Sequence, residues 1–502
     1  MPGPEEPGAT LNEILFRDGD GNTLPVTIVG RTGAIEESEL FSNPEHLIDE
    51  QDTMEKVPEL FGDKESEKEK AQPGWWNSTY FDEIYHARTA FEFLKGSVPY
   101  ETSHPPLGKV LMSACVAVFG MTPFGWRLAG ALAGILMLPG MYLLGKQLTK
   151  KTGIATFSCL FMALDCMHLT QTQIATIDSF PVVFIIFAYF FMLRFLQTDI
   201  QRERMKKILP DLAASGIFMG LSIASKWIGI YAGGGLAILF FWHCFRTALN
   251  DKDNTIKRVF ILCGWCVLFF AVIPVAIYLL SYIPYMAYNS RRIKTISDYI
   301  NEVWKSQIGM LNYHSTKNLG MDHPFYSPWW EWPTIGKPMY YATEQYLPKD
   351  TMMHYSIFCF GNPVIWYGGL AALVCCAVRA LINRRYILEK ENTRVWHLKT
   401  TSRDPRYMFI FTGILAQYLP WVLVPRGTYI YHYFASLPFL MLALSLCFDG
   451  WEGENRRKAY IIGGVITSFA VVAFIILIPY ACGIRVPVGW LDIGKRILKI
   501  WY

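Results

Sequence analysis

The sequence predicts an all-α polytopic membrane protein, and three observations support this fold class. Of the 502 residues, 52% are hydrophobic and only 18% are charged. Much of the chain consists of uncharged apolar segments that are long enough to cross a hydrocarbon core, which takes about 20 helical residues. Clusters of Lys and Arg separate these segments in alternate connecting loops, as expected for a chain that crosses a membrane repeatedly. This composition excludes an ordinary soluble protein and a disordered chain.

The first 73 residues differ from the rest of the chain. Residues 1–72 contain 18 Asp or Glu against six Lys or Arg. The β-branched run in Leu24–Ala34 predicts the end of a β-containing module. Met1–Thr10 shows neither the basic nor the apolar part of an export signal. We therefore interpret residues 1–73 as an acidic extracytoplasmic segment, the end of a truncated module, and expect a transmembrane helix upstream of it in a longer protein.

Residues 74–125 are predicted to form an outer loop with interfacial helices. Within it, Asp82 and Glu83 precede an amphipathic run that places Ala87, Phe91 and Leu94 on one helix face. Adjacent acids on a helix point in different directions, so one carboxylate can face a cavity while the other makes a structural bond. Repulsion between them raises at least one pKa. A solvated loop without catalytic function is the alternative interpretation.

Four cations lie close to this outer surface. The stiff turn from His104 to Lys109 is predicted to deliver a lysine to the membrane surface. Arg127, Lys226 and Arg426 lie at or just inside the outer ends of predicted spans, where a charge needs a partner or a function. Each alone is compatible with an interfacial anchor. Together, beside a carboxylate pair, they favour group transfer from a membrane-anchored phosphate carrier.

About ten spans are predicted, within residues 126–283 and 353–482, and residues 284–352 and 483–502 are expected to form an outer loop and an outer tail. The clearest spans are Leu128–Gly145, Val259–Ser290, Tyr355–Val378, Tyr407–Pro425, Gly427–Phe448 and Ala459–Gly483, and the weaker ones are 153–166, 176–193, 212–225 and 228–245. Basic clusters mark the cytoplasmic loops.

Several other functions are disfavoured by the motifs. The chain contains no Walker loop, HExxH motif or glycine-rich dinucleotide fingerprint, and its basic clusters are the flanks of spans. We therefore expect no nucleic-acid partner, no cofactor and no metal. The Cys263–Cys266 pair lies inside a predicted span without a second pair, so these cysteines are interpreted as small hydrophobic residues.

Many separate patches together resemble a bacterial protein O-mannosyltransferase, a member of the dolichyl/polyprenyl-phosphate-mannose–protein mannosyltransferase family. In order along residues 76–482, the patches are Phe81-Asp82-Glu83 with His86, His104–Lys109, Phe124–Leu128, Leu164–Asp178, Ala224–Gly229, Ser327–Pro333, Gly361–Trp366 and Tyr418–Trp421 with Arg426 and Tyr429–Tyr433. Each patch alone is weak, and their combination is specific.

The resemblance implies a C-type glycosyltransferase architecture in a bacterial plasma membrane, with the active site on the extracytoplasmic face. It implies inverting transfer of mannose, without a metal, from a polyprenyl-phosphate-mannose lipid donor to Ser or Thr hydroxyls of exported proteins. By the same resemblance Asp82 is the general base, Glu83 shapes the site and Arg127 binds the donor phosphate. Lys226, Arg426 and Lys109 are assigned to that phosphate as helpers. Substrate contacts are assigned to His104, Asp165, Asp178, His314, Trp330 and His432.

Two alternatives remain open at this point. One is a C-type glycosyltransferase that modifies a lipid or a cell-wall glycan. The other is a non-catalytic transporter or scaffold in which Asp82 and Arg127 form a structural ion pair. The outer loop at 284–352 is too short for the β-trefoil module of the eukaryotic relatives, so we expect acceptor selection to differ. Its aromatic residues are interpreted as a cover over the substrates or as an interfacial belt.

Overall fold

The computed structural model describes residues 74–250, 253–290, 292–343, 353–390, 404–449 and 452–498. The acidic segment 1–73, with its predicted β-containing module, lies outside the described residues.

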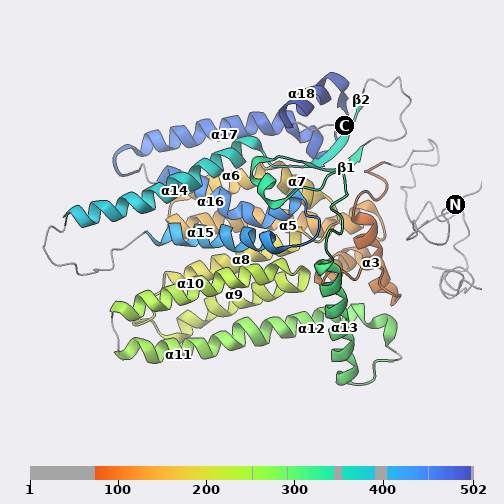
Figure 1. The fold of residues 1–502 in the computed structure, drawn as a ribbon, viewed down its shortest axis with the longest axis horizontal. Helices are drawn as coiled ribbons and strands as arrows, with labels where there is room; N and C mark the ends of the chain where they lie inside the picture. The colour runs from red at the N-terminus through yellow and green to blue at the C-terminus, as the bar shows by residue number, and fades with distance from the viewer. Residues whose placement is uncertain are drawn as a thin grey trace, which may run out of the picture. The chain divides into compact units, whose positions relative to one another are not determined.

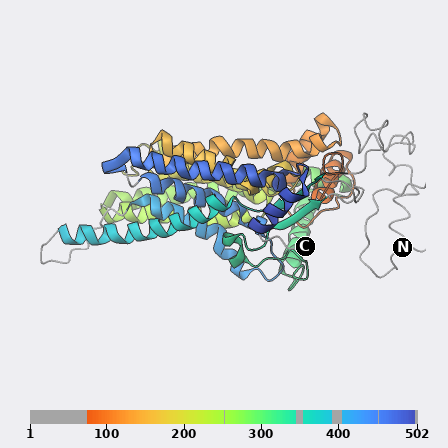
Figure 2. The same ribbon diagram turned by 90° about the horizontal axis from the view of Figure 1, so that it is seen from above.

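The described residues contain eight helical segments that are long and apolar enough to cross a membrane, which confirms the polytopic all-α class. They run side by side in both views of the ribbon (Figures 1 and 2). They are built from α5 (Pro123–Thr149), α8 (Ser179–Leu196), α9 (Met205–Ser225), α10 (Ile228–Asn250), α11 (Asp253–Val267) with η3 (Leu268–Val272) and α12 (Ile273–Tyr285), α14 (Pro363–Lys390), η7 (Ile430–Ser436) with α16 (Leu437–Asp449), and α17 (Glu452–Cys482).

Two further predicted spans are irregular. Helices α6 (Thr152–Ala163) and α7 (Cys166–Gln173) meet at a bend of 58° and count as a ninth span only when taken together. The predicted span Tyr407–Pro425 is wrong as a single helix: α15 (Pro405–Tyr418) has 14 residues and passes into the 3₁₀ helix η6 (Leu419–Leu423). Pro420 has no backbone N–H to continue the α-helical hydrogen bonds, which explains the change.

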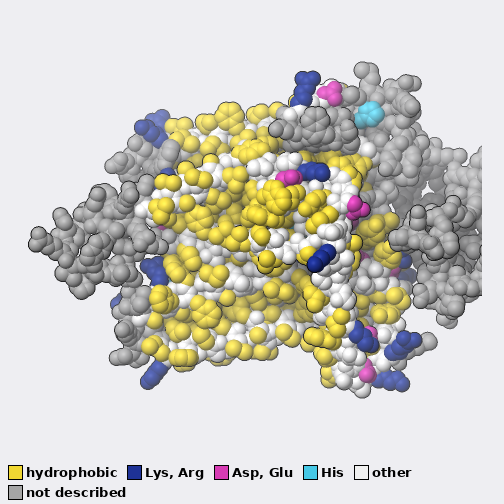
Figure 3. Space-filling view, in the orientation of Figure 1, with side chains coloured by type: hydrophobic (Ala, Val, Ile, Leu, Met, Phe, Trp, Pro, Cys, Tyr) yellow, Lys and Arg dark blue, Asp and Glu magenta, His cyan; other side chains and the backbone are white. Residues whose placement is uncertain are grey.

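Burial separates the central spans from the peripheral ones. Within the span Ile430–Asp449, 89% of the most apolar stretch is buried, against 17% for Ile256–Tyr285 and for Arg457–Cys482. Apolar side chains cover the sides of the helices, while Lys and Arg lie mainly toward their ends (Figure 3). The two peripheral spans therefore present their side chains to lipid, and the core lies around α16 and α8.

The remaining elements gather at one end of the helices, called the outer end from here on (Figure 1). They are α3 (Glu83–Lys95), α4 (Leu107–Phe119), η4 (Ala287–Asn289), α13 (Ile296–Ser315), η5 (Trp329–Thr334) and α18 (Val488–Leu498), with two small antiparallel sheets, β1 (Met339–Thr343) with β3 (Ser356–Cys359) and β2 (Met353–His354) with β4 (Val486–Pro487).

Helix α3 is amphipathic as predicted, but its buried face is displaced from the predicted one. Ala87, Ala90 and Phe93 are buried, whereas Leu94 is 44% exposed. The helix packs against α4 and against the end of α12, where the Phe93 and Tyr285 rings lie 6.1 Å apart. Packing against protein on this side buries the face that carries Ala87, Ala90 and Phe93. The helix ends at Gly96, whose φ of 63° is the left-handed conformation typical of a C-terminal cap.

Candidate active site

Asp82 occupies an unusual position at the start of α3. An Asp at this position normally accepts a hydrogen bond from the first turn of its helix. The Asp82 side chain makes no capping bond, and among the described residues none donates to it. The preceding residue, Phe81, has a φ of 52°, a conformation that aromatic residues rarely adopt, and its ring stacks 4.2 Å from Tyr341. A strained backbone therefore holds a carboxylate that the fold itself does not use.

The surroundings of Asp82 favour its protonated form. Burial, and after it the nearby Asp178 carboxylate, raise the pKa of Asp82 to about 7 against the opposing effect of Lys226. Asp178 accepts a hydrogen bond of 2.7 Å from the Lys226 ammonium, and both residues are almost fully buried. A carboxyl that is about half ionised near neutral pH is well matched to accepting a proton from a hydroxyl group.

Glu83, by contrast, is saturated with partners. Its two oxygens accept bonds of 2.7 Å each from Nε and from a terminal nitrogen of Arg127, and they also accept the backbone N–H groups of Ala175 at 2.9 Å and Tyr80 at 3.3 Å. Arg127 donates further to the Ser78 carbonyl at 2.9 Å. This bidentate pair ties α3 to α5 and to the chain after α7.

The pairing gives Arg127 a structural role, because its guanidinium holds the loop that carries Asp82 and Glu83. Binding of the donor phosphate by Arg127 stays a prediction. The structural ion pair considered between Asp82 and Arg127 is not observed, because Arg127 pairs with the neighbouring acid.

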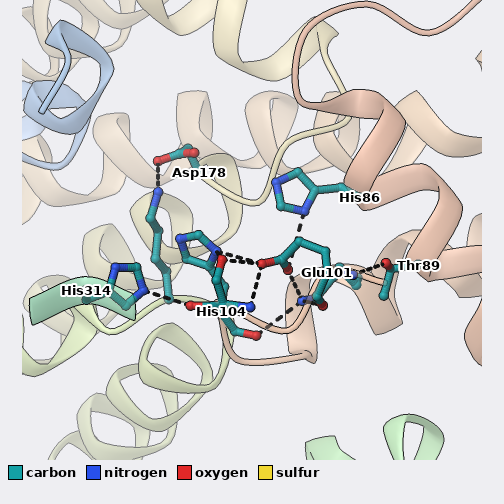
Figure 4. Close-up of polar contacts among 9 residues, drawn as sticks. His86, Thr89, Glu101, His104, Asp178 and His314 are labelled. Atoms are coloured by element: carbon teal, nitrogen blue, oxygen red, sulfur yellow. Dashed lines mark hydrogen bonds and ion pairs between the residues drawn. The ribbon is translucent and has the colours of Figure 1, made fainter. Parts of the chain in front are cut away.

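The turn after α3 is organised by Glu101, which the sequence did not single out. Its carboxylate forms an ion pair with the Lys109 ammonium and accepts bonds from the Ser103 hydroxyl at 2.5 Å and from His104 Nδ1 at 3.1 Å. Figure 4 shows Glu101 between His86 and His104. Lys109 is fully buried and also donates to the His104 carbonyl at 3.2 Å. The prediction that Lys109 reaches the membrane surface is therefore wrong, and its binding to the donor phosphate stays a prediction.

This buried network contains one anion and one cation. Burial opposes ionisation of Glu101, but Lys109 and His104 hold the pKa of its carboxyl well below the usual range. Burial lowers the pKa of His86 to about 4 and that of His104 to about 3, so both imidazoles are neutral at pH 7. A neutral His104 that donates through Nδ1 to Glu101 leaves its other ring nitrogen as an acceptor.

His314 and Arg426 complete this side of the site. His314 Nε2 donates to the Ser103 carbonyl at 2.7 Å, and its ring lies 5.1 Å from that of His104. Burial, and after it the charge of Arg426, lower the pKa of His314 to about 4. Arg426 lies 5.9 Å over the Tyr313 ring and forms no ion pair with any carboxylate in the described part of the chain. Its charge therefore remains available to an anionic substrate.

Two other predicted substrate contacts lie in different surroundings. His432 is buried, with its ring 4.3 Å from that of Trp421 and its Nδ1 accepting the Tyr429 N–H at 3.1 Å. Trp330 is 60% exposed and touches Trp329 edge to face, so it lies at the rim of the structure rather than in an enclosed site. These two residues stay predictions for substrate contact.

Asp165 has structural partners on both of its oxygens, and its contact with substrate stays a prediction. It is fully buried and caps α7 by accepting the N–H groups of Met167 and His168 at 3.1 and 3.2 Å. Its other oxygen accepts the Asn362 N–H at 3.0 Å and the Trp366 indole N–H at 2.8 Å. These four bonds occupy the carboxylate and join the bend between α6 and α7 to the start of α14.

A cavity of about 440 Å³ opens beside this site, between the turn after α3, the end of α12 and α13. Polar and aromatic side chains line it, among them Ser103, Tyr285, Tyr288, Lys305 and Tyr313. Such a lining is suited to a peptide or a sugar. In the part of the chain that the structure describes, no group of three or more His, Cys, Asp or Glu side chains is placed to hold a metal ion.

Comparison with known proteins then identifies the family. Residues 118–287 match the sequence model described as dolichyl-phosphate-mannose-protein mannosyltransferase, and residues 299–495 match the C-terminal four-transmembrane region of protein O-mannosyltransferases. The chain belongs to the protein O-mannosyltransferase family. The resemblance predicted from the sequence patches is thereby confirmed, and the chain is an enzyme of the glycosyltransferase class.

Curated relatives and a solved structure agree with this membership. The polyprenol-phosphate-mannose–protein mannosyltransferase of Mycobacterium tuberculosis is 23% identical over 81% of this chain and 83% of its own, and that of Corynebacterium glutamicum is 26% identical over 75% of each.

The Saccharomyces cerevisiae protein O-mannosyltransferase complex bound to its sugar donor superposes with a TM-score of 0.71 at 13% identity, over 84% of this chain and 89% of the other. ArnT from Cupriavidus metallidurans bound to undecaprenyl phosphate has the same fold, with a TM-score of 0.50 at 14% identity over 84% of this chain and 68% of its own. The C-type glycosyltransferase architecture is confirmed.

Proposed function

We propose that the chain transfers mannose from a polyprenyl-phosphate-mannose donor to Ser or Thr hydroxyls of exported proteins, with Asp82 as the general base. The observation that carries the proposal is the contrast between two adjacent carboxylates. Glu83 is saturated by Arg127 and backbone N–H groups, whereas Asp82 has no hydrogen-bond partner among the described residues and a pKa near 7. The relatives' names supply the donor and the acceptor class.

The transfer is a single displacement. A carboxylate oxygen of Asp82 takes the proton of the acceptor hydroxyl while the hydroxyl oxygen forms a bond to the anomeric carbon. The bond from that carbon to the phosphate oxygen breaks, and its electron pair leaves with the polyprenyl phosphate. Attack from the face opposite the leaving group inverts the anomeric centre. No acid is required for the leaving group, because it departs as a stabilised anion.

Cations at the outer end stabilise the departing phosphate. Arg426 is the best candidate because no carboxylate among the described residues neutralises it. Lys226 is a weaker one, since Asp178 already compensates its charge. Fixed positive groups in a partly desolvated site lower the energy of developing negative charge without reorganisation. The acceptor peptide enters from the cavity lined by Ser103 and Tyr313, on the water side of the site.

The test supplies purified protein in lipid vesicles with polyprenyl phosphate carrying radiolabelled mannose and a peptide that contains Ser and Thr. Label is expected on the peptide, and none on the same peptide with every Ser and Thr replaced by Ala. Asp82→Asn should lower the rate by about 10² to 10⁴-fold, the usual contribution of a general base. Asp322→Asn makes the same charge change at an exposed outer residue and should leave the rate unchanged.

The outcomes of this experiment distinguish between the acceptor classes and test the role of Asp82. Label that appears only on a lipid or glycan fraction would support the alternative acceptor class. Full activity of Asp82→Asn would remove the proposed base while leaving the family membership intact.

A further inference from the structure

Helix α13 lies across the direction of the spans at the outer end (Figure 1). It starts with a capping box in which Thr295 and Asp298 each accept the other's backbone N–H. One side of it packs on the end of α12 through a small cluster of Tyr282, Met286, Val303 and Met310. This packing fixes the rotation of the helix about its own axis.

Hydrogen bonds fix the same side of the helix. The Tyr299 hydroxyl donates to the Leu279 carbonyl at 2.5 Å. Gln307 accepts from the Tyr278 hydroxyl at 2.6 Å and donates to the Tyr282 hydroxyl at 3.0 Å. Tyr299 and Gln307 lie on the face that also carries Val303 and Met310, so the other two flanks of the helix are free of α12.

One free flank is an apolar stripe. Its members recur every three or four positions, which places them on one face of a helix with about 3.6 residues per turn. They are between 42% and 84% exposed and comprise Ile296, Ile300, Trp304, Ile308 and Leu311. The other free flank is polar and comprises Asp298, Asn301, Glu302, Lys305 and Asn312.

The polar flank faces water, because Glu302 and Lys305 line the 440 Å³ cavity described above. Helix α12, on which the Val303 side of α13 packs, exposes Val275, Leu280 and Ile283 on a span that presents its side chains to lipid. A helix that has a strongly apolar flank and a charged flank, and that lies across the spans, is typical of the boundary between lipid headgroups and acyl chains.

We propose that α13 is an interfacial membrane helix whose stripe Ile296–Leu311 inserts into the outer leaflet of the bilayer. Lipid then covers the apolar face of α13 that no protein element in the described part of the chain covers. The helix thereby separates two media beside the active site: lipid on its apolar flank and the water-filled cavity on its polar flank.

The insertion has a consequence for the site, which rests on the proposed function. The last turn of α13 carries Tyr313, under the Arg426 guanidinium, and His314, which is bonded to the Ser103 carbonyl. The depth of the stripe in the leaflet therefore sets the height of Arg426, the cation assigned to the phosphate of the lipid donor.

Tryptophan fluorescence tests the insertion without requiring activity. The full chain is placed in phosphatidylcholine vesicles with or without brominated acyl chains, and the signal of Trp304 is obtained by subtracting that of Trp304→Phe. Quenching of this difference signal by the brominated lipid is expected. In the matched control, Trp304→Phe with Asn312→Trp, the new indole lies on the polar flank of the same helix and should not be quenched. Equal quenching at both positions, or none at Trp304, overturns the proposal.

A kinetic comparison tests the link to the donor. Ile300→Asp with Ile308→Asp should raise the KM for the long-chain polyprenyl donor in vesicles about tenfold, since both side chains lose apolar burial. Asn301→Asp with Asn312→Asp adds the same two charges on the polar flank and should leave this KM unchanged. Equal effects of the two double variants would overturn the link. If Asp82→Asn kept full activity, the proposed function would be contradicted, but the fluorescence result would still report whether α13 inserts into the bilayer.

Discussion

Asp82 and Glu83 are neighbours of the same chemical type, and their surroundings give them different tasks. Glu83 accepts four hydrogen bonds and faces a guanidinium, so its side chain is held in one position. Asp82 lies beside a second carboxylate in a partly buried position and has no such bonds among the described residues. At the scale of single residues, the hydrogen bonds therefore distinguish Asp82, the proposed base, from Glu83, which supports the loop.

The first prediction concerns pH. Because only ionised Asp82 can accept a proton, kcat/KM should rise about tenfold per pH unit below 7 and level off above it, with an apparent pKa near 7. The measurement is initial mannosyl transfer to peptide between pH 5 and pH 9. A flat profile over this range would contradict the assignment of Asp82 as the base.

The second prediction uses the two charges that act on Asp82 in opposite directions. Asp178→Asn removes a negative charge, so the pKa of Asp82 should fall and the rising limb of kcat/KM should move to lower pH. Lys226→Met removes a positive charge, so the limb should move to higher pH. The pH profiles of the two variants measure the shifts, and movement of both limbs in the same direction would show that these residues act through structure alone.

The third prediction concerns stability. Breaking a buried ion pair by removing one partner costs about 3 to 5 kcal/mol, because the other charge is left unpaired. Glu83→Ala should therefore lower the melting temperature in detergent strongly. Arg127→Lys should lower it too, because an ammonium cannot reproduce the two-pronged bond to Glu83. Asp82→Asn should leave the melting temperature unchanged or higher, and it serves as the matched control.

At the scale of elements, the bend between α6 and α7 depends on one side chain. Asp165 caps α7 and holds the Trp366 indole and the Asn362 backbone. In Asp165→Asn the side-chain oxygen can still accept two of these hydrogen bonds, but the new NH₂ group faces the other two N–H donors and cannot accept from them. We expect faster thermal inactivation with little change in the initial rate at low temperature. A selective loss of rate with unchanged thermal stability would instead support the substrate role first predicted for Asp165.

The elements that could be predicted from the sequence are those with a single physical cause. Long uncharged runs predict spans because a helix in the hydrocarbon core must satisfy its own backbone hydrogen bonds and carry apolar side chains. Eight such spans appear among the described residues. The segment Tyr407–Pro425 was misjudged because hydropathy does not register that Pro420 interrupts the α-helix. The face of α3 was misjudged because its partner is α4 rather than lipid, and a periodicity alone does not reveal the partner.

The sequence predicted which residues belong to the site better than it predicted which of them form ion pairs with each other. The paired acids and the distal cations are visible in the sequence, but which cation meets which acid depends on folding. Arg127 lies 44 positions from Glu83, and Lys226 lies 48 from Asp178. The role of Glu101 could not be predicted, because a single acidic residue in a loop belongs to no recognisable sequence motif. The one signal was its position three residues before His104 and eight before Lys109.

At the scale of the whole molecule, the basic clusters predict that the outer end faces away from the cytoplasm. In intact cells, a membrane-impermeant maleimide should label a cysteine introduced at Ser315, in the outer loop. A cysteine at Lys206, in the first turn of α9, should be labelled only after permeabilisation. The unaltered chain, with its eleven cysteines, gives the background. The reverse labelling pattern would contradict the orientation on which the proposed function depends.

The partial burial of Asp82 also restricts which proteins can be modified. A Ser or Thr on the surface of a compact domain projects only a few ångströms beyond its neighbours, so the domain would collide with α3 and α13 before its hydroxyl met the base. An unfolded, flexible segment of polypeptide is narrow enough to avoid this collision. The enzyme is therefore expected to distinguish polypeptides by their state of folding, and to decorate linkers, tails and newly exported chains in preference to finished domains.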